Sequence, residues 1–201
     1  MQPAHEEIEL KWALPLEGHA RLAELLPEAI GPARLLRQEN RFFDTADRRL
    51  RAARMNLRLR HENGRWLMTC KHKAGNGPSG LHDGLARHTE WEEWLDGEPA
   101  LARLPLPEQA LAALAGGELL PLGGFANERL EFAIVRDGLD ELLALDRTDY
   151  GVRIDHELEI ETADPPRTAS FWSGQLDLWG VPWSLQTETK FARFLGLNSA
   201  T

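Results

Sequence analysis

The first strand-like segment of the chain is Glu7-Ile8-Glu9-Leu10-Lys11, in which charged and apolar side chains alternate. A β-strand turns successive side chains to opposite faces, so Glu7, Glu9 and Lys11 would share one face. Two carboxylates and an amine on one face suit a metal ion and a phosphate group. Alone, the pattern is weak evidence, because any half-buried strand alternates and its polar side usually faces solvent.

The same alternation recurs in four later strand-like segments, and each of these carries charges of one sign. They are Leu57-Arg58-Leu59-Arg60, Met68-Thr69-Cys70-Lys71-His72-Lys73, Glu90-Trp91-Glu92 and Glu157-Leu158-Glu159-Ile160-Glu161. Like charges on neighbouring strands repel each other in an open sheet. In a barrel with the charged faces inward, basic strands could hold an anion and acidic strands a divalent cation. We therefore predict an α+β, mainly β fold: a closed antiparallel eight-stranded barrel with helices packed outside and a charged lumen as the active surface.

Length and composition are typical of one globular domain, and we expect residues 1–201 to form it. The chain has 201 residues, of which 42% are hydrophobic and 27% charged. No apolar run is long enough to span a membrane and no basic-then-apolar leader is present, so we expect neither a membrane span nor a signal peptide. The single Cys70 excludes an internal disulfide and favours a cytoplasmic location.

The net charge limits the range of partners. It is −9 at pH 7, which argues against non-specific nucleic-acid binding, where a basic face supplies the affinity. A bound polyanion must therefore be met by lysines and arginines gathered in one place. We expect a small-molecule partner, with neither nucleic acid nor membrane, and a monomer or homodimer.

Other segments indicate helices, turns and loops. Amphipathic or alanine-rich patterns predict helices over residues 15–31, with an interruption at Pro27 left open, and over 107–115 and 167–178. The His61-Glu62-Asn63-Gly64 segment predicts a hairpin turn. Further strands are expected within 127–135, 142–146 and 152–161, and residues 74–80 are expected to form a loop that lacks the Gly-Lys-Ser/Thr of a phosphate-binding loop.

Several conspicuous residues have plain structural interpretations. Arg48-Arg49-Leu50-Arg51 is interpreted as a solvated turn between strands rather than a nucleic-acid site. His72 falls on the apolar phase of its strand, which favours a packing role over metal ligation. The tryptophans of the strand segments are expected to pack on the outer face or in the core; they are Trp12, Trp66, Trp91 and Trp94.

Taken in order, these motifs resemble the CYTH domain family, also called the triphosphate tunnel metalloenzymes, over essentially the whole chain. The family's signature Glu-x-Glu-x-Lys corresponds to Glu7, Glu9 and Lys11. The remaining motifs are Phe42-Phe43-Asp44-Thr45, Leu57-Arg58-Leu59-Arg60, Lys71-His72-Lys73, Glu90 with Glu92, Arg129, Leu145-Asp146, Glu157-Leu158-Glu159-Ile160-Glu161 and Lys190. The phrases Glu62-Asn63-Gly64-Arg65 and Gly80-Leu81-His82 are most similar to the bacterial inorganic triphosphatase branch, whose members often carry a helical CHAD domain that we do not expect here.

The resemblance implies a metal-dependent inorganic triphosphatase with a cationic tunnel. The residues expected to bind the triphosphate are Lys11, Arg58, Arg60, Lys71, Lys73, Arg129 and Lys190. Those expected to hold Mg²⁺ or Mn²⁺ are Glu7, Glu9, Asp146, Glu157 and Glu159. The catalytic set is expected to be Lys11, Arg58, Arg60, Lys71 and Glu159. Glu161 shares the phase of the other acids and is expected near the tunnel mouth.

One position departs from the family pattern. The family usually has an arginine two residues before the glutamate at the Glu90 position, whereas this chain has His88 there and Arg87 one residue out of phase. Either a β-bulge turns Arg87 inward or one phosphate contact is missing.

Two other classes of function remain open from the sequence. A related enzyme would be a thiamine-triphosphatase or a class IV-type adenylyl cyclase of the same family. A non-enzyme would be a polyphosphate- or nucleotide-binding module. Five acids facing the ligand favour catalysis, because a pure anion binder does not need them.

Overall fold

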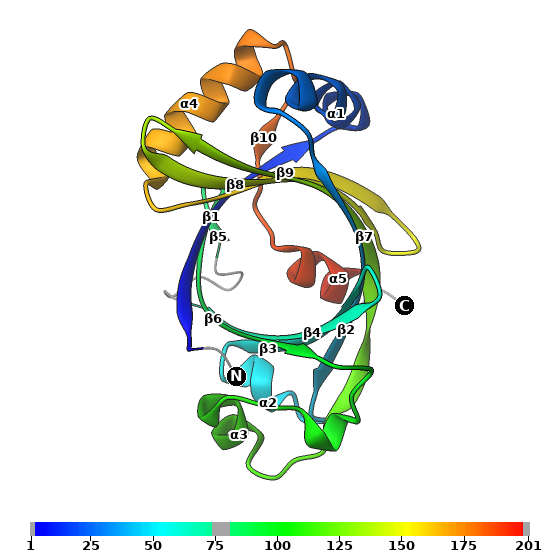
Figure 1. Cartoon of the computed structure of the whole chain (residues 1–201). Coiled ribbons are helices and arrows are strands. Elements are labelled where there is room, and N and C mark those ends of the chain that lie inside the picture. The colour runs from blue at the N-terminus through cyan, green and yellow to red at the C-terminus, as the bar shows by residue number, and fades with distance from the viewer. Residues whose placement is uncertain (1–2, 74–80, 199–201) are drawn as a thin grey trace.

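Eight long strands close into an antiparallel barrel in the computed structural model, which describes residues 3–73 and 81–198 (Figure 1). The order around the barrel is β1, β9, β8, β7, β2, β3, β4 and β6, and pairing of β1 with β6 closes it. The bounds are β1 His5–Leu14, β2 Arg34–Asp44, β3 Met55–Glu62, β4 Arg65–Lys73, β6 Leu85–Leu95, β7 Leu120–Arg136, β8 Leu139–Asp149 and β9 Ile154–Thr162. Two short strands lie beside the barrel strands: β5 Leu81–His82 pairs with β6, and β10 Ser184–Leu185 pairs with β1. The predicted closed barrel is confirmed.

The outward-facing apolar phase is covered by helices at two sides of the barrel. Leu10 and Trp12 of β1 lie under α1 Leu16–Ile30 and α4 Pro165–Leu178, in a core that also holds the buried Trp172. Met68 and Cys70 of β4 lie in a second core, with α2 Arg49–Ala52 and α3 Glu108–Leu114. A short 3-10 helix, Leu101–Arg103, precedes α3. Because strand side chains alternate, burying these apolar phases outside turns the charged phases into the lumen.

Two local predictions hold in detail. The β3–β4 hairpin turns at Asn63-Gly64, whose φ angles of 46° and 85° are those of a two-residue turn with left-handed backbone. Helix α1 ends at Ile30 and is capped by Gly31, where φ is 100°, and it continues through Pro27 without interruption. The helices predicted near 107–115 and 167–178 are also present.

Two interpretations of individual segments are wrong. The Arg48–Arg51 segment is not a turn, because Arg49–Ala52 form α2 and Leu50 is fully buried in the second core, although Arg48 and Arg51 are exposed as expected. Asp44 fixes this helix by accepting backbone N–H bonds from Leu50 at 2.9 Å and Arg51 at 3.0 Å. His72 is exposed on the outer face, so it has no packing role. Trp12 and Trp91 are buried and Trp66 packs against the second core, as expected.

The last helix, α5 Lys190–Asn198, lies inside the ring of strands rather than outside it (Figure 1). Its Phe191 and Phe194 stack on Phe42 of β2, with ring centroids 4.6 Å and 5.7 Å away, and Phe194 also contacts Phe125 of β7. These two strand phenylalanines fall on the lumen phase and form the apolar surface on which the helix packs. The expectation that the helices pack outside therefore fails for α5.

None of the helices in the described part of the chain is long and apolar enough to cross a membrane.

Candidate active site

The lumen contains a cavity of about 310 Å³ lined by charged side chains from most of the barrel strands. This volume is at the lower end of the range for small-molecule sites, roughly 300–1,000 Å³. The predicted substrate residues that line it are Lys11, Arg58, Arg60, Lys71, Lys73, Arg129 and Lys190. The lining acids from the prediction are Glu7, Glu9 and Glu159. Side chains from six separate segments of the sequence thus line one small cavity.

The basic wall of the cavity is formed by β3 and β4. Arg58 donates to Thr69 Oγ1 at 3.1 Å, and its buried Nε has no hydrogen-bond partner among the described residues. Arg60 donates to Asn40 Oδ1 at 3.1 Å and lies 3.6 Å from a Glu62 oxygen. Burial, together with the neighbouring guanidinium groups of Arg58 and Arg129, lowers the pKa of Arg60 to about 9. Crowded cations of this kind are stabilised when an anion binds between them.

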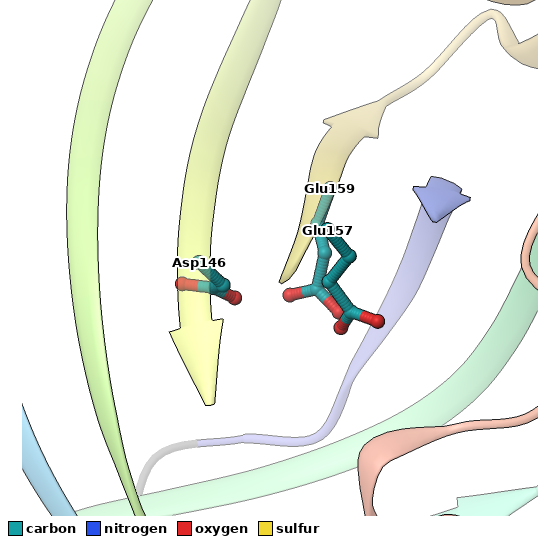
Figure 2. Close-up of side chains that lie close together, drawn as sticks. All are labelled: Asp146, Glu157 and Glu159. Atoms are coloured by element: carbon teal, nitrogen blue, oxygen red, sulfur yellow. The ribbon is translucent and has the colours of Figure 1, made fainter. Parts of the chain in front are cut away.

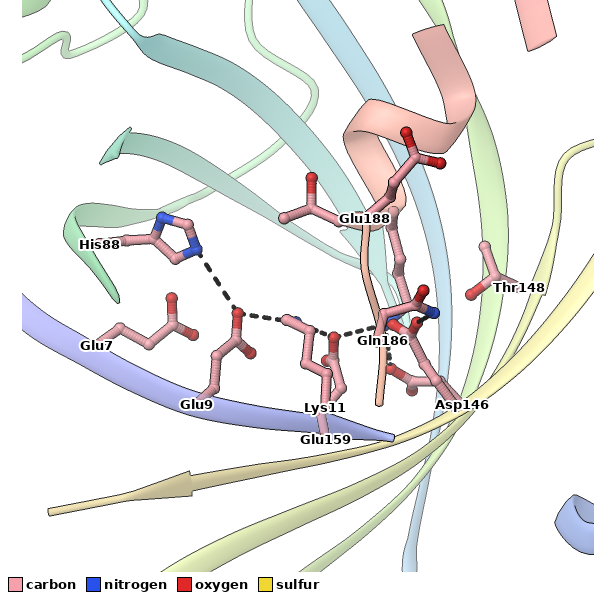
Figure 3. Close-up of polar contacts among 12 residues, drawn as sticks. Glu7, Glu9, Lys11, His88, Asp146, Thr148, Glu159, Gln186 and Glu188 are labelled. Carbon is pink, nitrogen blue, oxygen red and sulfur yellow. Dashed lines mark hydrogen bonds and ion pairs between the residues drawn. The ribbon is translucent and has the colours of Figure 1, made fainter. Parts of the chain in front are cut away.

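The acidic wall begins on β1, where two glutamates pair with lumen lysines. Lys71 bridges Glu7 and, at 3.0 Å, Glu90. Lys11 lies 2.8 Å from Glu9 and also pairs with Glu159 (Figure 3). Although burial opposes the charge, Glu159 and Glu9 raise the pKa of Lys11, so the ammonium stays protonated. Acids and bases of the lumen are therefore paired with each other, around Lys71 in one group and around Lys11 in another.

The remaining acids form a second group on β8 and β9. Asp146, Glu157 and Glu159 offer carboxylate oxygens that all lie within 4.8 Å of one another (Figure 2). We call these three residues the acidic trio. Asp146 and Glu157 have no exposed surface. Burial would raise the pKa of Asp146, but Arg129 and Lys190 outweigh it and lower this pKa to about 2.

The acidic trio fits a hard divalent cation by its chemistry. Carboxylate oxygens are the ligands that Mg²⁺ and Mn²⁺ prefer. Glu157 Oε1 is buried and ion-paired with the Lys190 ammonium, so it is already a ligand to a cation. The five acids predicted to hold metal are therefore split into the trio and the Glu7–Glu9 pair, and both groups contact Lys11 or Lys71.

The uncertainty at Arg87 and His88 is resolved by the register of β1 with β6. The pairing is regular from His5–Glu90 to Leu10–Leu85, so no bulge turns Arg87 inward. Arg87 is exposed and lies 3.8 Å from Glu6, outside the lumen. His88 lines the cavity with its Nε2 3.7 Å from Glu9 (Figure 3). Burial and then the charge of Lys71 lower the pKa of His88 to about 3, so the histidine supplies no positive charge at neutral pH.

Some lumen residues were missed or misinterpreted from the sequence. Trp94 lines the cavity and its side chain is 37% exposed, so the expectation of outer-face or core packing is wrong for this tryptophan. Its position two residues after Glu92 in a regular strand was the signal for a lumen-facing side chain. Gln186 and Arg193, which bind Glu157, carried no such signal because neither lies on a barrel strand.

Comparison with known proteins gives consistent matches. The family model described as "CYTH domain" matches residues 5–177. A curated Bacillus subtilis protein, "Putative triphosphatase YjbK", is 25% identical over 158 residues, covering 78% of each chain.

Solved structures share the fold over nearly the whole chain. HpAC1 from Hippeastrum, described as a "putative adenylyl cyclase" with a dominant triphosphatase activity, superposes with a TM-score of 0.81 at 30% identity, over 94% of this chain and 95% of that one. A "putative adenylate cyclase" from Bacillus halodurans has a TM-score of 0.69 at 24% identity, over 96% and 99% of the two chains.

Proposed function

This chain belongs to the CYTH domain family, and from that premise we propose that it is a metal-dependent hydrolase of inorganic triphosphate. The reaction is cleavage of tripolyphosphate to diphosphate and phosphate by water. The observation that carries the proposal is the crowding of lysine and arginine side chains in one cavity of about 310 Å³, beside the acidic trio, of which Glu159 lines the cavity. The cationic wall matches the substrate's charge, and the carboxylates match a divalent ion that such a substrate brings or requires.

The lumen cations differ in how much of their charge is available to a bound phosphate. Arg58 has no ion pair among the described residues, so its charge is available to an incoming phosphate. Lys11, Arg129 and Lys190 already pair with carboxylates and would share their remaining hydrogen-bond donors with the substrate. Fixed donors in a partly desolvated site stabilise the charge that develops as the terminal phosphoryl group is transferred.

Mg²⁺ or Mn²⁺, held by carboxylates of the lumen, would neutralise phosphate charge and lower the pKa of a bound water. The lumen cations would hold the terminal phosphoryl group in line for attack by water. A bond forms between the water oxygen and the terminal phosphorus, the bridging P–O bond breaks, diphosphate leaves with the bridging oxygen, and the proton lost by the water passes to the phosphate products or to solvent. Lys71 and Lys73 line the same cavity and would compensate the charge of the phosphate chain.

The test is phosphate release from tripolyphosphate, ATP and thiamine triphosphate, each with Mg²⁺, with Mn²⁺ and with excess chelator. We expect tripolyphosphate to give by far the highest kcat/KM and the chelator to abolish turnover. A matched control is Arg37→Met, which removes an exposed outer-face arginine one residue from a lumen position and should leave turnover unchanged.

Three outcomes would reject the proposal in favour of another. Turnover of thiamine triphosphate at least as efficient as that of tripolyphosphate would indicate a thiamine-triphosphatase. Formation of a cyclic nucleotide from ATP would indicate an adenylyl cyclase. Binding of all three compounds without turnover would indicate a polyphosphate- or nucleotide-binding module.

A further inference from the structure

Lys190 lies among the oxygens of the acidic trio, which is the position that a divalent cation would take. Its Nζ is 2.7 Å from Asp146 Oδ2 and 2.9 Å from Glu159 Oε1, and it also pairs with Glu157 Oε1. Although burial opposes it, Asp146, Glu157 and Glu159 raise the pKa of Lys190. The trio thus already coordinates a cation, and that cation belongs to the chain itself.

Helix α5 delivers this ammonium, and several contacts keep the helix in place. Lys190 is its first residue, and Phe191 and Phe194 pack on the lumen phenylalanine Phe42. Arg193 donates to Glu157 Oε2 at 2.6 Å. These contacts anchor the helix without Lys190, so the lysine side chain can leave the trio while α5 stays in the barrel.

A metal ion and the Lys190 ammonium exclude each other from the trio. A divalent cation needs the carboxylate lone pairs that Lys190 now uses, and two cations at ligand distance repel strongly. The lysine has a place to go, because its side chain also lines the cavity in which the triphosphate would bind. A flexible four-carbon stem lets the ammonium turn from carboxylates to phosphate oxygens within the same site.

We propose that Lys190 is an exchangeable cation, which occupies the acidic trio until a divalent metal enters and then transfers its charge to the phosphate chain. The transfer of charge to the phosphate chain rests on the proposed function, since triphosphate is the substrate named above. The displacement of Lys190 from the trio concerns metal binding alone. It follows that the metal binds weakly to the free protein and that metal and triphosphate favour each other's binding, as reciprocal linkage requires.

The experiment measures Mn²⁺ affinity of the full chain without any phosphate, by electron paramagnetic resonance of free Mn²⁺. Lys190→Met keeps the length of the side chain and removes the competing charge, so Mn²⁺ should bind about tenfold more tightly, within the usual range of coupling between two ligands. Lys190→Arg keeps a cation and should bind Mn²⁺ as the wild type does. Arg34→Met removes a positive charge that lines the same cavity but lies 3.7 Å from Glu131 and pairs with it rather than with the trio, so it should leave the affinity unchanged.

The outcomes separate the exchange from the proposed function. Unchanged or weaker Mn²⁺ binding by Lys190→Met would overturn the exchange, and so would equal tightening by Arg34→Met, which would show a general charge effect. Tripolyphosphate hydrolysis is measured separately, so its absence would reject the function while leaving the metal result standing. Should Lys190→Met not fold, Lys190→Gln replaces it, because glutamine also removes the charge but keeps a polar side chain: Mn²⁺ should again bind more tightly than to the wild type, and unchanged or weaker binding would overturn the proposal.

Discussion

Arg58 allows activity and stability to be separated, because it is a lumen cation whose charge no carboxylate balances among the described residues. Arg58→Met keeps the aliphatic stem and removes the guanidinium. Loss of one preorganised donor to developing charge typically costs about 2.7–4 kcal/mol, so kcat for tripolyphosphate should fall by roughly 100- to 1,000-fold. Among the residues that the structure describes, the hydrogen bond lost is the one to Thr69, so the free energy of unfolding should change by less than about 1 kcal/mol.

Arg129 is the matched comparison for this prediction. It donates to both oxygens of Asp146, at 2.8 Å and 2.7 Å, and to Glu159 at 2.7 Å. Arg129→Met therefore leaves a fully buried carboxylate short of a partner and should cost about 3 kcal/mol or more of stability as well as activity. Phosphate release and urea unfolding followed by tryptophan fluorescence measure the two effects. If Arg58→Met loses less than fivefold in kcat, or loses as much stability as Arg129→Met, the assignment of Arg58 to the substrate is refuted.

Three further predictions follow from the same lumen. Glu9→Gln removes a charged oxygen ligand but keeps the shape, so turnover should fall about a hundredfold with an unchanged circular dichroism spectrum; full activity would contradict a metal role. The pKa of Asp146 is lowered from 3.8 to about 2, so the stability its charge confers should be complete above pH 4 and disappear as the pH falls through 2. In urea unfolding, the deficit of Asp146→Asn against wild type should therefore shrink over that interval, and a constant deficit would refute the assignment. Trp94→Ala should lower the kcat/KM for ATP about tenfold and leave the kcat/KM for tripolyphosphate unchanged, because stacking of a base on an aromatic ring contributes about 1–3 kcal/mol. Trp94→Phe keeps an aromatic ring and should retain most of the kcat/KM for ATP. An equal loss for both substrates would exclude a stacking role.

The lumen-facing strand residues could be predicted from the sequence because strand direction is a local property. Side chains alternate with a period of two, so the in-phase charges of Glu7, Glu9 and Lys11 had to share a face. The apolar residues between them had to be buried on the other face. Trp94 also follows the strand alternation, since it lies two residues after Glu92 and faces the lumen with it. The prediction for Trp94 was wrong because it rested on the residue type, tryptophan, and not on the position in the strand. The β3–β4 hairpin was equally local, since Asn63-Gly64 suits the left-handed backbone of its turn.

The sequence by itself determined which strand faces are charged, and with them the closed barrel and the charged strand residues that face its lumen. Only the tertiary structure decided how those charges pair and where α5 lies. An amphipathic helix indicates that it needs an apolar surface without indicating which one, and here that surface is formed by Phe42 and Phe125 from distant strands. For the same reason no local pattern could place Lys190 among Asp146, Glu157 and Glu159, because the free energy of burying that ammonium depends on carboxylates that only the closed barrel brings together.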